Sequence, residues 1–215
     1  MTAILRRWYR RMRFGDPVIV VSGLPRSGTS MAMKMLEAGG VPIVTDGQRE
    51  ADIDNPKGYF EDERVLRLAE AAEKAWLRGS RGKAIKIISY LLRHLPSDNN
   101  YKVVFMRRDL SEVLASQAKM LERRGETNDG DDQRMRELFE TDLWKAGYFM
   151  KHAAHVEAVE IHYSEVLADP EGHARLIAEF VGGGLDVQRM AEVVDPDLYR
   201  NRAEDRPDPA ERPPR

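Results

Sequence analysis

The stretch Pro17-Val-Ile-Val-Val-Ser-Gly-Leu-Pro-Arg-Ser-Gly-Thr-Ser30 decides the fold. Its first six residues are mainly β-branched and apolar, which is typical of a strand that is buried on both faces of a parallel sheet. A glycine-bearing turn follows, and apolar residues between Met31 and Leu36 predict a helix that Gly39-Gly40 ends. A loop between a strand and a helix can turn its backbone N–H groups toward an anion, and the positive end of the helix adds to the attraction. The stretch therefore predicts an anion-binding loop.

The loop lacks the lysine of a nucleoside triphosphatase. It fits the frame G-x-x-x-x-G-K-S/T at every fixed position but one, because Thr29 stands in place of the lysine. That lysine reaches the β- and γ-phosphates of ATP or GTP, so its loss disfavours triphosphate hydrolysis. The cation of the loop is instead Arg26, three positions earlier. A cation at that position would face a single 5′-terminal group of a nucleotide rather than a triphosphate.

The rest of the chain alternates strand and helix patterns. Three further buried-type strands are predicted at 84–88, 103–106 and 159–163, and helices at 61–77, 111–121, 134–155 and 169–180. This order predicts an α/β protein, with a three-layer P-loop fold in which helices cover a mostly parallel central sheet of about four to five strands. Residues 16–202 form that domain. Residues 203–215 contain no large apolar side chain, which predicts a disordered tail.

The composition excludes several classes of protein. The 215 residues include no cysteine, which rules out disulfides, cysteine-based zinc sites and thiol catalysis. A net charge of −2 disfavours a nucleic-acid partner. No apolar run approaches the roughly 20 residues of a membrane span. The basic start is not followed by the apolar stretch that a signal peptide requires, so we expect a cytoplasmic protein.

The first 15 residues form a basic amphipathic segment that carries five arginines among aromatic and apolar residues. Such a segment could lie on an anionic membrane. A helix that docks on its own domain is the simpler account. We therefore expect membrane contact by residues 1–14 to be weak or nil.

Residues 25–30 resemble the 5′-phosphosulfate loop P-R/K-S-G-T-S/T of sulfotransferases that use 3′-phosphoadenosine-5′-phosphosulfate (PAPS). The resemblance implies that Arg26 is the first cation of the donor site. The donor-binding residues that it implies are Pro25, Arg26, Ser27, Gly28, Thr29 and Ser30.

A second stretch, residues 103–116, resembles the strand-then-helix pattern R-D/N-P-x-D/E-V-x-x-S of the same family. The resemblance implies that Arg108 and Ser116 bind the 3′-phosphate. The sequence departs from the pattern in Leu110, which replaces a proline, and in an additional arginine, Arg107, which leaves open which of the two arginines holds the phosphate. Residues 162–182 resemble a third, structural segment of the family.

The general base has several candidates. Residues 55–61, Asn-Pro-Lys-Gly-Tyr-Phe-Glu, resemble a segment of bacterial family members, which favours Glu61 as the base, although a glutamate in a first helical turn is also common. Asp46 is the second candidate, and Lys86 corresponds to a strand lysine that could neutralise charge near the leaving group. His94 follows its strand too late to match the histidine of animal family members.

The remaining donor candidates are two basic residues near the end of the domain, Arg200 and Arg202, which could close over the nucleotide.

The resemblance implies a sulfotransferase that moves a sulfuryl group from PAPS to a hydroxyl or amine of a small-molecule acceptor, releases 3′-phosphoadenosine-5′-phosphate (PAP) and requires no metal. Two alternatives stay open. One is a kinase-like enzyme that uses nucleoside triphosphates, and the other is a non-catalytic nucleotide-binding relative. The sequence specifies neither the acceptor nor the oligomeric state.

Overall fold

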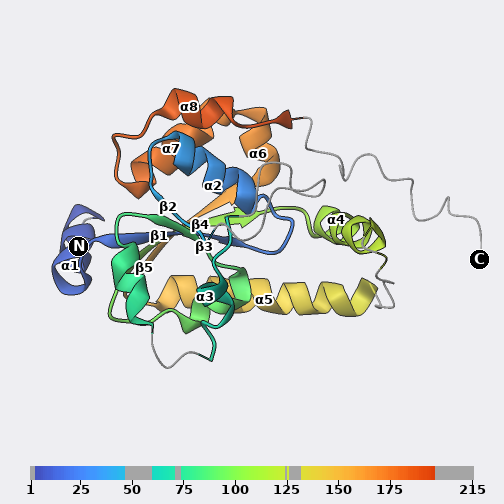
Figure 1. Cartoon of the computed structure of the whole chain (residues 1–215), viewed down its shortest axis with the longest axis horizontal. Helices are drawn as coiled ribbons and strands as arrows, with labels where there is room; N and C mark the ends of the chain where they lie inside the picture. Colours follow the sequence, from blue (N-terminus) through green and yellow to red (C-terminus); the bar gives the residue numbers. More distant parts are fainter. Residues whose placement is uncertain (1–2, 47–59, 71–73, 124, 126–131, 197–215) are drawn as a thin grey trace, which may run out of the picture.

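Five parallel strands form the central sheet of the protein, in the order β2-β3-β1-β4-β5 (Figure 1). The structure is a computed structural model, and it describes residues 3–46, 60–70, 74–123, 125 and 132–196. The strands are β1 (Pro17–Gly23), β2 (Ile43–Val44), β3 (Ala84–Lys86), β4 (Asn100–Arg107) and β5 (Val156–His162). All four neighbouring pairs are parallel, which confirms the predicted fold class.

The order of the strands creates one switch point. From β1 the chain builds β2 and β3 on one side, and it then crosses to place β4 and β5 on the other. Gly23 at the end of β1 pairs with Met106 near the end of β4, so the loops that follow these strands leave the sheet at the same level. Ligands of open α/β sheets bind at such a point, outside the carboxyl ends of the strands.

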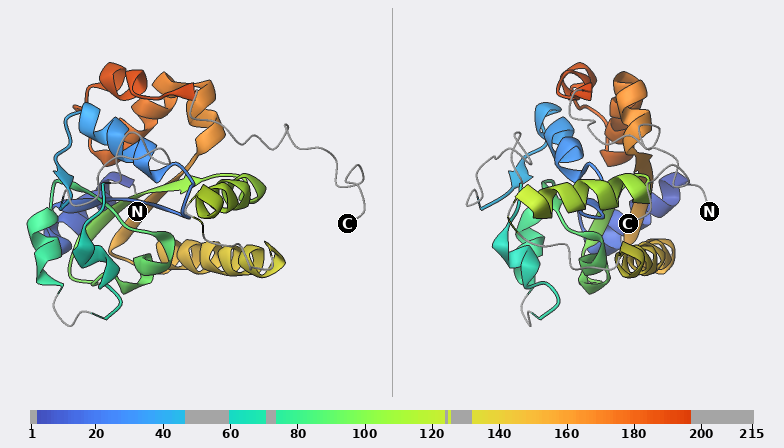
Figure 2. Two further views of the ribbon diagram at one scale, coloured as in Figure 1. Left: turned by 45° about the vertical axis from the view of Figure 1, so that its right-hand side comes forward. Right: turned by 90° about the vertical axis from the view of Figure 1, so that its right-hand side faces the viewer.

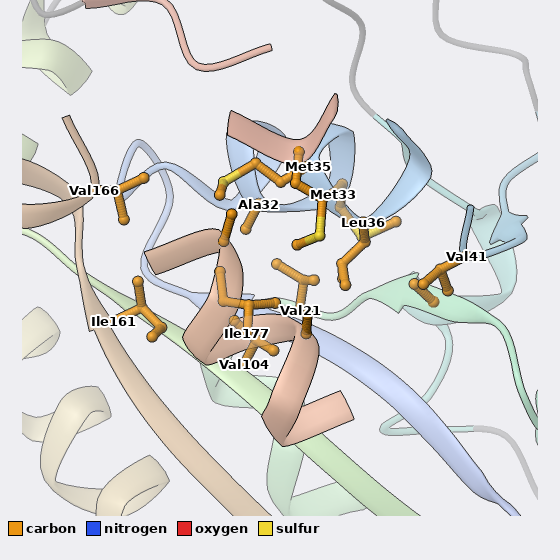
Figure 3. Packing of buried hydrophobic residues seen from close by; sticks show 14 of the residues in the cluster. Val21, Ala32, Met33, Met35, Leu36, Val41, Val104, Ile161, Val166 and Ile177 are labelled. Carbon is orange, nitrogen blue, oxygen red and sulfur yellow. The ribbon is translucent and has the colours of Figure 1, made fainter. Parts of the chain in front are cut away.

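One face of the sheet is covered by four helices, namely α2 (Thr29–Ala38), α6 (Tyr163–Ala168), α7 (Pro170–Val181) and α8 (Val187–Glu192) (Figure 1). Figure 3 shows the core of this layer, where Val21 and Val104 of the sheet lie beneath Met33 of α2 and Ile177 of α7. Asp169 begins α7 as predicted, since its Oδ1 accepts a hydrogen bond from Gly172 N–H at 2.9 Å.

The opposite face is covered by α3 (Glu63–Leu66), the 3₁₀ helices η1 (Ala75–Ser80) and η2 (Ser89–His94), and α5 (Asp132–His152). The helix α4 (Leu110–Arg123) follows β4 and lies beside the first half of α5 (Figure 2). The helix α1 (Ala3–Phe14) precedes β1 and lies at the opposite end of the sheet (Figure 1). None of the helices that the structure describes combines the length and apolar character that crossing a membrane requires.

The predicted helix over 61–77 is wrong. Its described residues form the four-residue α3, a turn and then η1. The apolar side chains of Val65, Leu68 and Leu77 are buried against the sheet, whereas that of Leu66 is 68% exposed. The spacing of apolar residues does not determine whether the backbone forms one helix or several short turns. The short strand β2 was likewise not predicted within the loop after Val41. The predicted tail at 203–215 lies outside the described residues.

Candidate active site

The loop between β1 and α2 requires glycine at position 28. Gly28 has φ +100° and caps α2, and a Cβ atom there would lie 2.5 Å from Cδ2 of Tyr163. Both the backbone conformation and the space therefore exclude a side chain. The loop is closed by Ser27, whose Oγ donates to the backbone oxygen of Leu24 at 2.7 Å. The first N–H groups of α2 have no carbonyl partner within their own helix, so they suit an anion.

Arg26 occupies an unusual backbone conformation in this loop. Its φ is +67°, in the left-handed region that costs a residue with a long side chain about 1–2 kcal/mol. Its side chain is fixed by Ser116 of α4, whose Oγ accepts a hydrogen bond from Arg26 Nε at 3.0 Å. A strained residue that is held in place by tertiary contacts is typical of functional sites.

Arg108 follows β4 and lies against the same loop. Its Nη1 donates to the backbone oxygen of Arg26 at 3.2 Å, and its Nε donates to Oε2 of Glu112 at 2.8 Å. The Arg108 and Glu112 side chains are both almost fully buried, with 8% and 4% of their surface exposed. The structure thus brings Arg26, Arg108 and Ser116, predicted from separate motifs, to one place at the switch point of the sheet. Arg107, by contrast, pairs with Glu160 of β5 at 3.8 Å.

The ring of Tyr163 packs against this cluster. The ring faces Gly28, and the guanidinium carbon of Arg108 lies 4.7 Å from the ring centroid. Burial raises the pKa of the Tyr163 hydroxyl, and the positive charge of Arg108 partly opposes that rise. The resemblance of residues 162–182 to the family implied a structural role only. The contact of Tyr163 with the loop could not be seen in a local pattern.

Glu61 and Lys86 meet on the other side of β1. Lys86 Nζ lies 3.4 Å from Oε1 of Glu61, and Lys86 pairs in the sheet with Val21, two residues before the loop begins. The backbone oxygen of Glu61 accepts hydrogen bonds from Thr45 Oγ1 at 2.9 Å and from Asp46 N–H at 3.1 Å. Three candidates from different segments therefore lie together at the carboxyl ends of β2 and β3.

The backbone around Glu61 is constrained on both sides. Phe60 has φ +52°, a strained value for an aromatic residue, while its side chain packs against the core. Asp62 is buried, caps α3 and binds Arg64 through both carboxylate oxygens, at 2.9 and 2.6 Å. This hydrogen bonding lowers the pKa of Asp62. Asp62 was not predicted from the sequence, because no motif marks an aspartate that pairs with an arginine two residues away.

Asp46 has a backbone role in the structure. Its Oδ2 accepts a hydrogen bond from Glu63 N–H at 2.7 Å, and this bond ties the end of β2 to the start of α3. His94 lies in η2, where its ring accepts from Arg93 Nε at 3.1 Å and its backbone oxygen accepts from Lys74 Nζ. Arg200, Arg202 and residues 55–59 lie outside the described residues. Within the described part of the chain, no three histidine or acidic side chains are grouped as metal ligands.

A family model described as "Sulfotransferase family" matches residues 72–186, which is more than half of the chain. The chain belongs to the sulfotransferase family. Among solved structures, the "Sulfotransferase Domain from the Curacin Biosynthetic Pathway" is similar with a TM-score of 0.50 and 14% identity, over 85% of this chain and 79% of that one. A sulfotransferase from Alicyclobacillus acidocaldarius gives a TM-score of 0.47 and 16% identity, over 85% and 87%. A comparison with curated proteins gives no match.

The matched segment contains only part of the candidate active site of this sulfotransferase. Lys86, Arg108, Ser116 and Tyr163 lie within residues 72–186, whereas the loop with Arg26 precedes them. The contact between Arg26 and Ser116 joins the loop to the matched segment.

Proposed function

We propose that this sulfotransferase uses PAPS as its donor and a hydroxyl or amine of a small molecule as its acceptor. The observation that carries the proposal is the convergence of Arg26, Arg108 and Ser116 beside the start of α2. Two guanidinium groups, a hydroxyl and a helix N-terminus are donors that suit phosphate and sulfate oxygens. PAPS has anionic groups at two positions of one nucleoside, and the β1–α2 loop and the start of α4 supply two sets of donors.

The residues of the site fit such a nucleotide. The absence of a side chain at Gly28 lets the Tyr163 ring pack directly against the loop, and it permits the positive φ at which the loop can turn its backbone N–H groups toward an anion. Residues 25–30 would hold the 5′-phosphosulfate, and Arg108 with Ser116 would hold the 3′-phosphate. Glu112 orients Arg108 through a buried, charge-assisted hydrogen bond. We assign the 3′-phosphate to Arg108 rather than Arg107, because Arg108 contacts the loop and Arg107 contacts β5.

When bound, PAPS supplies the sulfuryl group and provides PAP as the leaving group. Glu61 takes the proton that the acceptor hydroxyl or amine loses as its lone pair forms the new bond to sulfur. Lys86 holds the Glu61 carboxylate in position and contributes positive charge beside the β1–α2 loop. Arg26 and the N–H groups of the loop stabilise the charge that the leaving phosphate gains. Asp46 stays the second candidate for the base, although its hydrogen bond to Glu63 N–H favours a positioning role.

The donor can be tested by binding. We expect isothermal titration calorimetry to show that PAP binds more tightly than ATP and that Mg²⁺ does not change this order. Arg26→Ala and Arg108→Ala should each weaken PAP binding roughly tenfold or more, because each removes a charge-assisted contact. Arg107→Ala is the matched control and should bind PAP normally. A Mg²⁺-dependent preference for ATP would favour the kinase-like alternative, and tight PAP binding without turnover of any acceptor would favour the non-catalytic one.

A further inference from the structure

The N-terminal helix α1 separates its apolar and basic residues onto opposite sides. Leu5, Trp8, Tyr9 and Met12 recur at the spacing that places them on one side of a helix. All four are exposed, Trp8 to 62% and Met12 to 70%. Arg10, Arg11 and Arg13 lie outside that stripe, and residues 1–14 include no acidic residue.

The basic side of α1 is the side that docks on the domain. Arg10 Nε donates to the backbone oxygen of Ala154 at 3.1 Å, and Arg10 Nη1 donates to Oε2 of Glu157 at 2.9 Å. Phe14, one turn later on the same side, packs edge-on against the ring of His155. The helix therefore docks on its own domain, as expected from the sequence, but Leu5, Trp8, Tyr9 and Met12 stay exposed. This arrangement removes the reason for expecting weak membrane contact.

We propose that α1 binds an anionic membrane surface through the stripe formed by Leu5, Trp8, Tyr9 and Met12. Helices of this kind lie in the plane of the interface, with an apolar face at the headgroup boundary and arginines near anionic headgroups. Arg13 lies beside the stripe, since its Nη1 donates to the Tyr9 hydroxyl at 2.6 Å and its guanidinium faces the Tyr9 ring. Arg11 is exposed and pairs with Asp16, which is also exposed.

Charge distinguishes an anionic membrane from a second copy of this chain as the occupant of the stripe. Two α1 helices that paired through their stripes would bring Arg11 and Arg13, which flank the stripe, close to the same residues of the other copy, and residues 1–14 include no acidic residue to offset them. An anionic surface, by contrast, attracts each arginine that approaches it.

The position of α1 determines how the candidate active site would face the membrane. The helix leads into the amino end of β1, whereas Arg26 follows its carboxyl end. The seven residues of β1 span about 20 Å at roughly 3.3 Å per residue. A membrane bound by α1 would thus lie at the end of the sheet remote from the site. Acceptors would approach from the aqueous side, and membrane binding does not depend on the donor proposed above.

Co-sedimentation of the full chain with vesicles tests the proposal. We expect binding to vesicles of phosphatidylcholine with phosphatidylglycerol at low salt, and little binding to phosphatidylcholine alone or at high salt. The double variant Trp8→Ser/Met12→Ser should lower the partition coefficient roughly tenfold or more, because it removes two apolar side chains from the stripe. Arg11→Gln/Arg13→Gln should weaken binding to the anionic vesicles and reduce its dependence on salt.

A matched control comes from α5. Trp144 is exposed to 68%, so Trp144→Ser removes an equally accessible tryptophan far along the chain from α1 and should leave vesicle binding unchanged. Circular dichroism and PAP binding check that each variant is folded, and neither should change. No binding to the anionic vesicles, or equal binding by Trp8→Ser/Met12→Ser, would overturn the proposal. So would a dimer in analytical ultracentrifugation that this double variant converts to a monomer.

Discussion

The side chain of Arg26 donates a hydrogen bond to the hydroxyl of Ser116 at 3.0 Å, although 90 residues separate the two in sequence. Arg26 follows the first strand of the sheet and Ser116 lies in the helix after the fourth. The bond therefore spans the switch point at which the chain changes direction across the sheet. It therefore links the orientation of the Arg26 guanidinium to the position of α4. The helix α4 carries Ser116, which belongs to the second proposed set of anion donors.

This bond gives the first prediction. Ser116→Ala removes the acceptor of the Arg26 hydrogen bond, which is partly buried, and the hydroxyl that we propose as a donor to the 3′-phosphate. We expect PAP to bind roughly tenfold more weakly, and the unfolding midpoint to change little. Calorimetry and thermal unfolding measure the two effects. Ser164→Ala, an exposed serine next to Tyr163, is the control and should change neither quantity.

The second prediction concerns the support beneath Arg108. Glu112→Gln removes the negative partner of a buried guanidinium, and an uncompensated buried charge costs about 3–5 kcal/mol. We expect a clear fall in the free energy of unfolding, measured by urea denaturation, together with weaker PAP binding.

Glu160→Gln is the comparison for this prediction, since Glu160 pairs with Arg107 in an exposed position and at a longer distance. Exposed pairs contribute at most about 1 kcal/mol, so this variant should unfold almost as the unaltered protein does. If Glu112→Gln and Glu160→Gln lowered the free energy of unfolding equally, the buried Arg108–Glu112 pair would stabilise the fold no more than the exposed pair does.

The third prediction separates strain from contact at Gly28. Gly28 and Gly40 have almost the same backbone conformation, with φ +100° and +97°, but a Cβ would strike the Tyr163 ring only at Gly28. Gly28→Ala and Gly40→Ala therefore share the cost of strain, about 1–2 kcal/mol. Gly28→Ala should destabilise the protein further and abolish PAP binding, whereas Gly40→Ala should retain binding. Loss of binding in both variants would contradict the role assigned to the ring contact.

Much of the fold followed from the sequence, because its signals are local. The run of apolar residues from Val18 to Val21 predicts a buried strand, and both that strand and the predicted sheet class are confirmed. Asp169 predicts the start of α7 because a cap and its helix are adjacent in sequence. The predicted helix over 61–77 is wrong at its end rather than at its start, because α3, which Asp62 caps, ends at Leu66 and η1 begins only at Ala75.

The candidate site was less accessible to sequence reasoning where its contacts are long-range. Individual residues such as Arg26 and Arg108 could be chosen from their motifs, but the contact between them depends on two strands that become neighbours only in the sheet. The resemblance of residues 162–182 implied only a structural role for Tyr163, and Asp62 lies in no motif. The importance of both residues lies in what they contact. The pairing of Glu61 with Lys86 also required the structure, because 25 residues separate them.

The fourth prediction tests the acceptor side. Glu61→Gln keeps the shape of the side chain but cannot accept a proton, so turnover should fall by about 10²-fold or more while PAP binding stays unchanged. Product formation from PAPS across a set of hydroxyl and amine acceptors measures turnover. Glu63→Gln alters an exposed glutamate two residues later, and it should retain activity. If Asp46→Asn abolished turnover and Glu61→Gln did not, the base would be Asp46.

The fifth prediction concerns pH and His155, which lies between the rings of Phe14, Tyr101 and Phe149. Burial lowers the pKa of His155 below its ordinary value of 6.5, and the nearby charge of Arg10 lowers it further. The unfolded chain therefore binds a proton at a higher pH than the folded protein does. Folding stability from this residue is complete above pH 6.5, and it falls as the pH drops below that value.

Thermal unfolding between about pH 8 and pH 5 measures this dependence. His155→Phe should flatten the profile between pH 6.5 and pH 5, because Phe fits an aromatic environment and His155 Nε2 makes no hydrogen bond to any residue that the structure describes. His152→Gln, at an exposed position three residues earlier, should leave the profile unchanged. If the profile of His155→Phe kept its full slope in this range, the loss of stability would have to come from other groups. Because His155 contacts Phe14, the same titration should loosen α1 before the rest of the domain unfolds, and hydrogen exchange at residues 8–14 would detect that order.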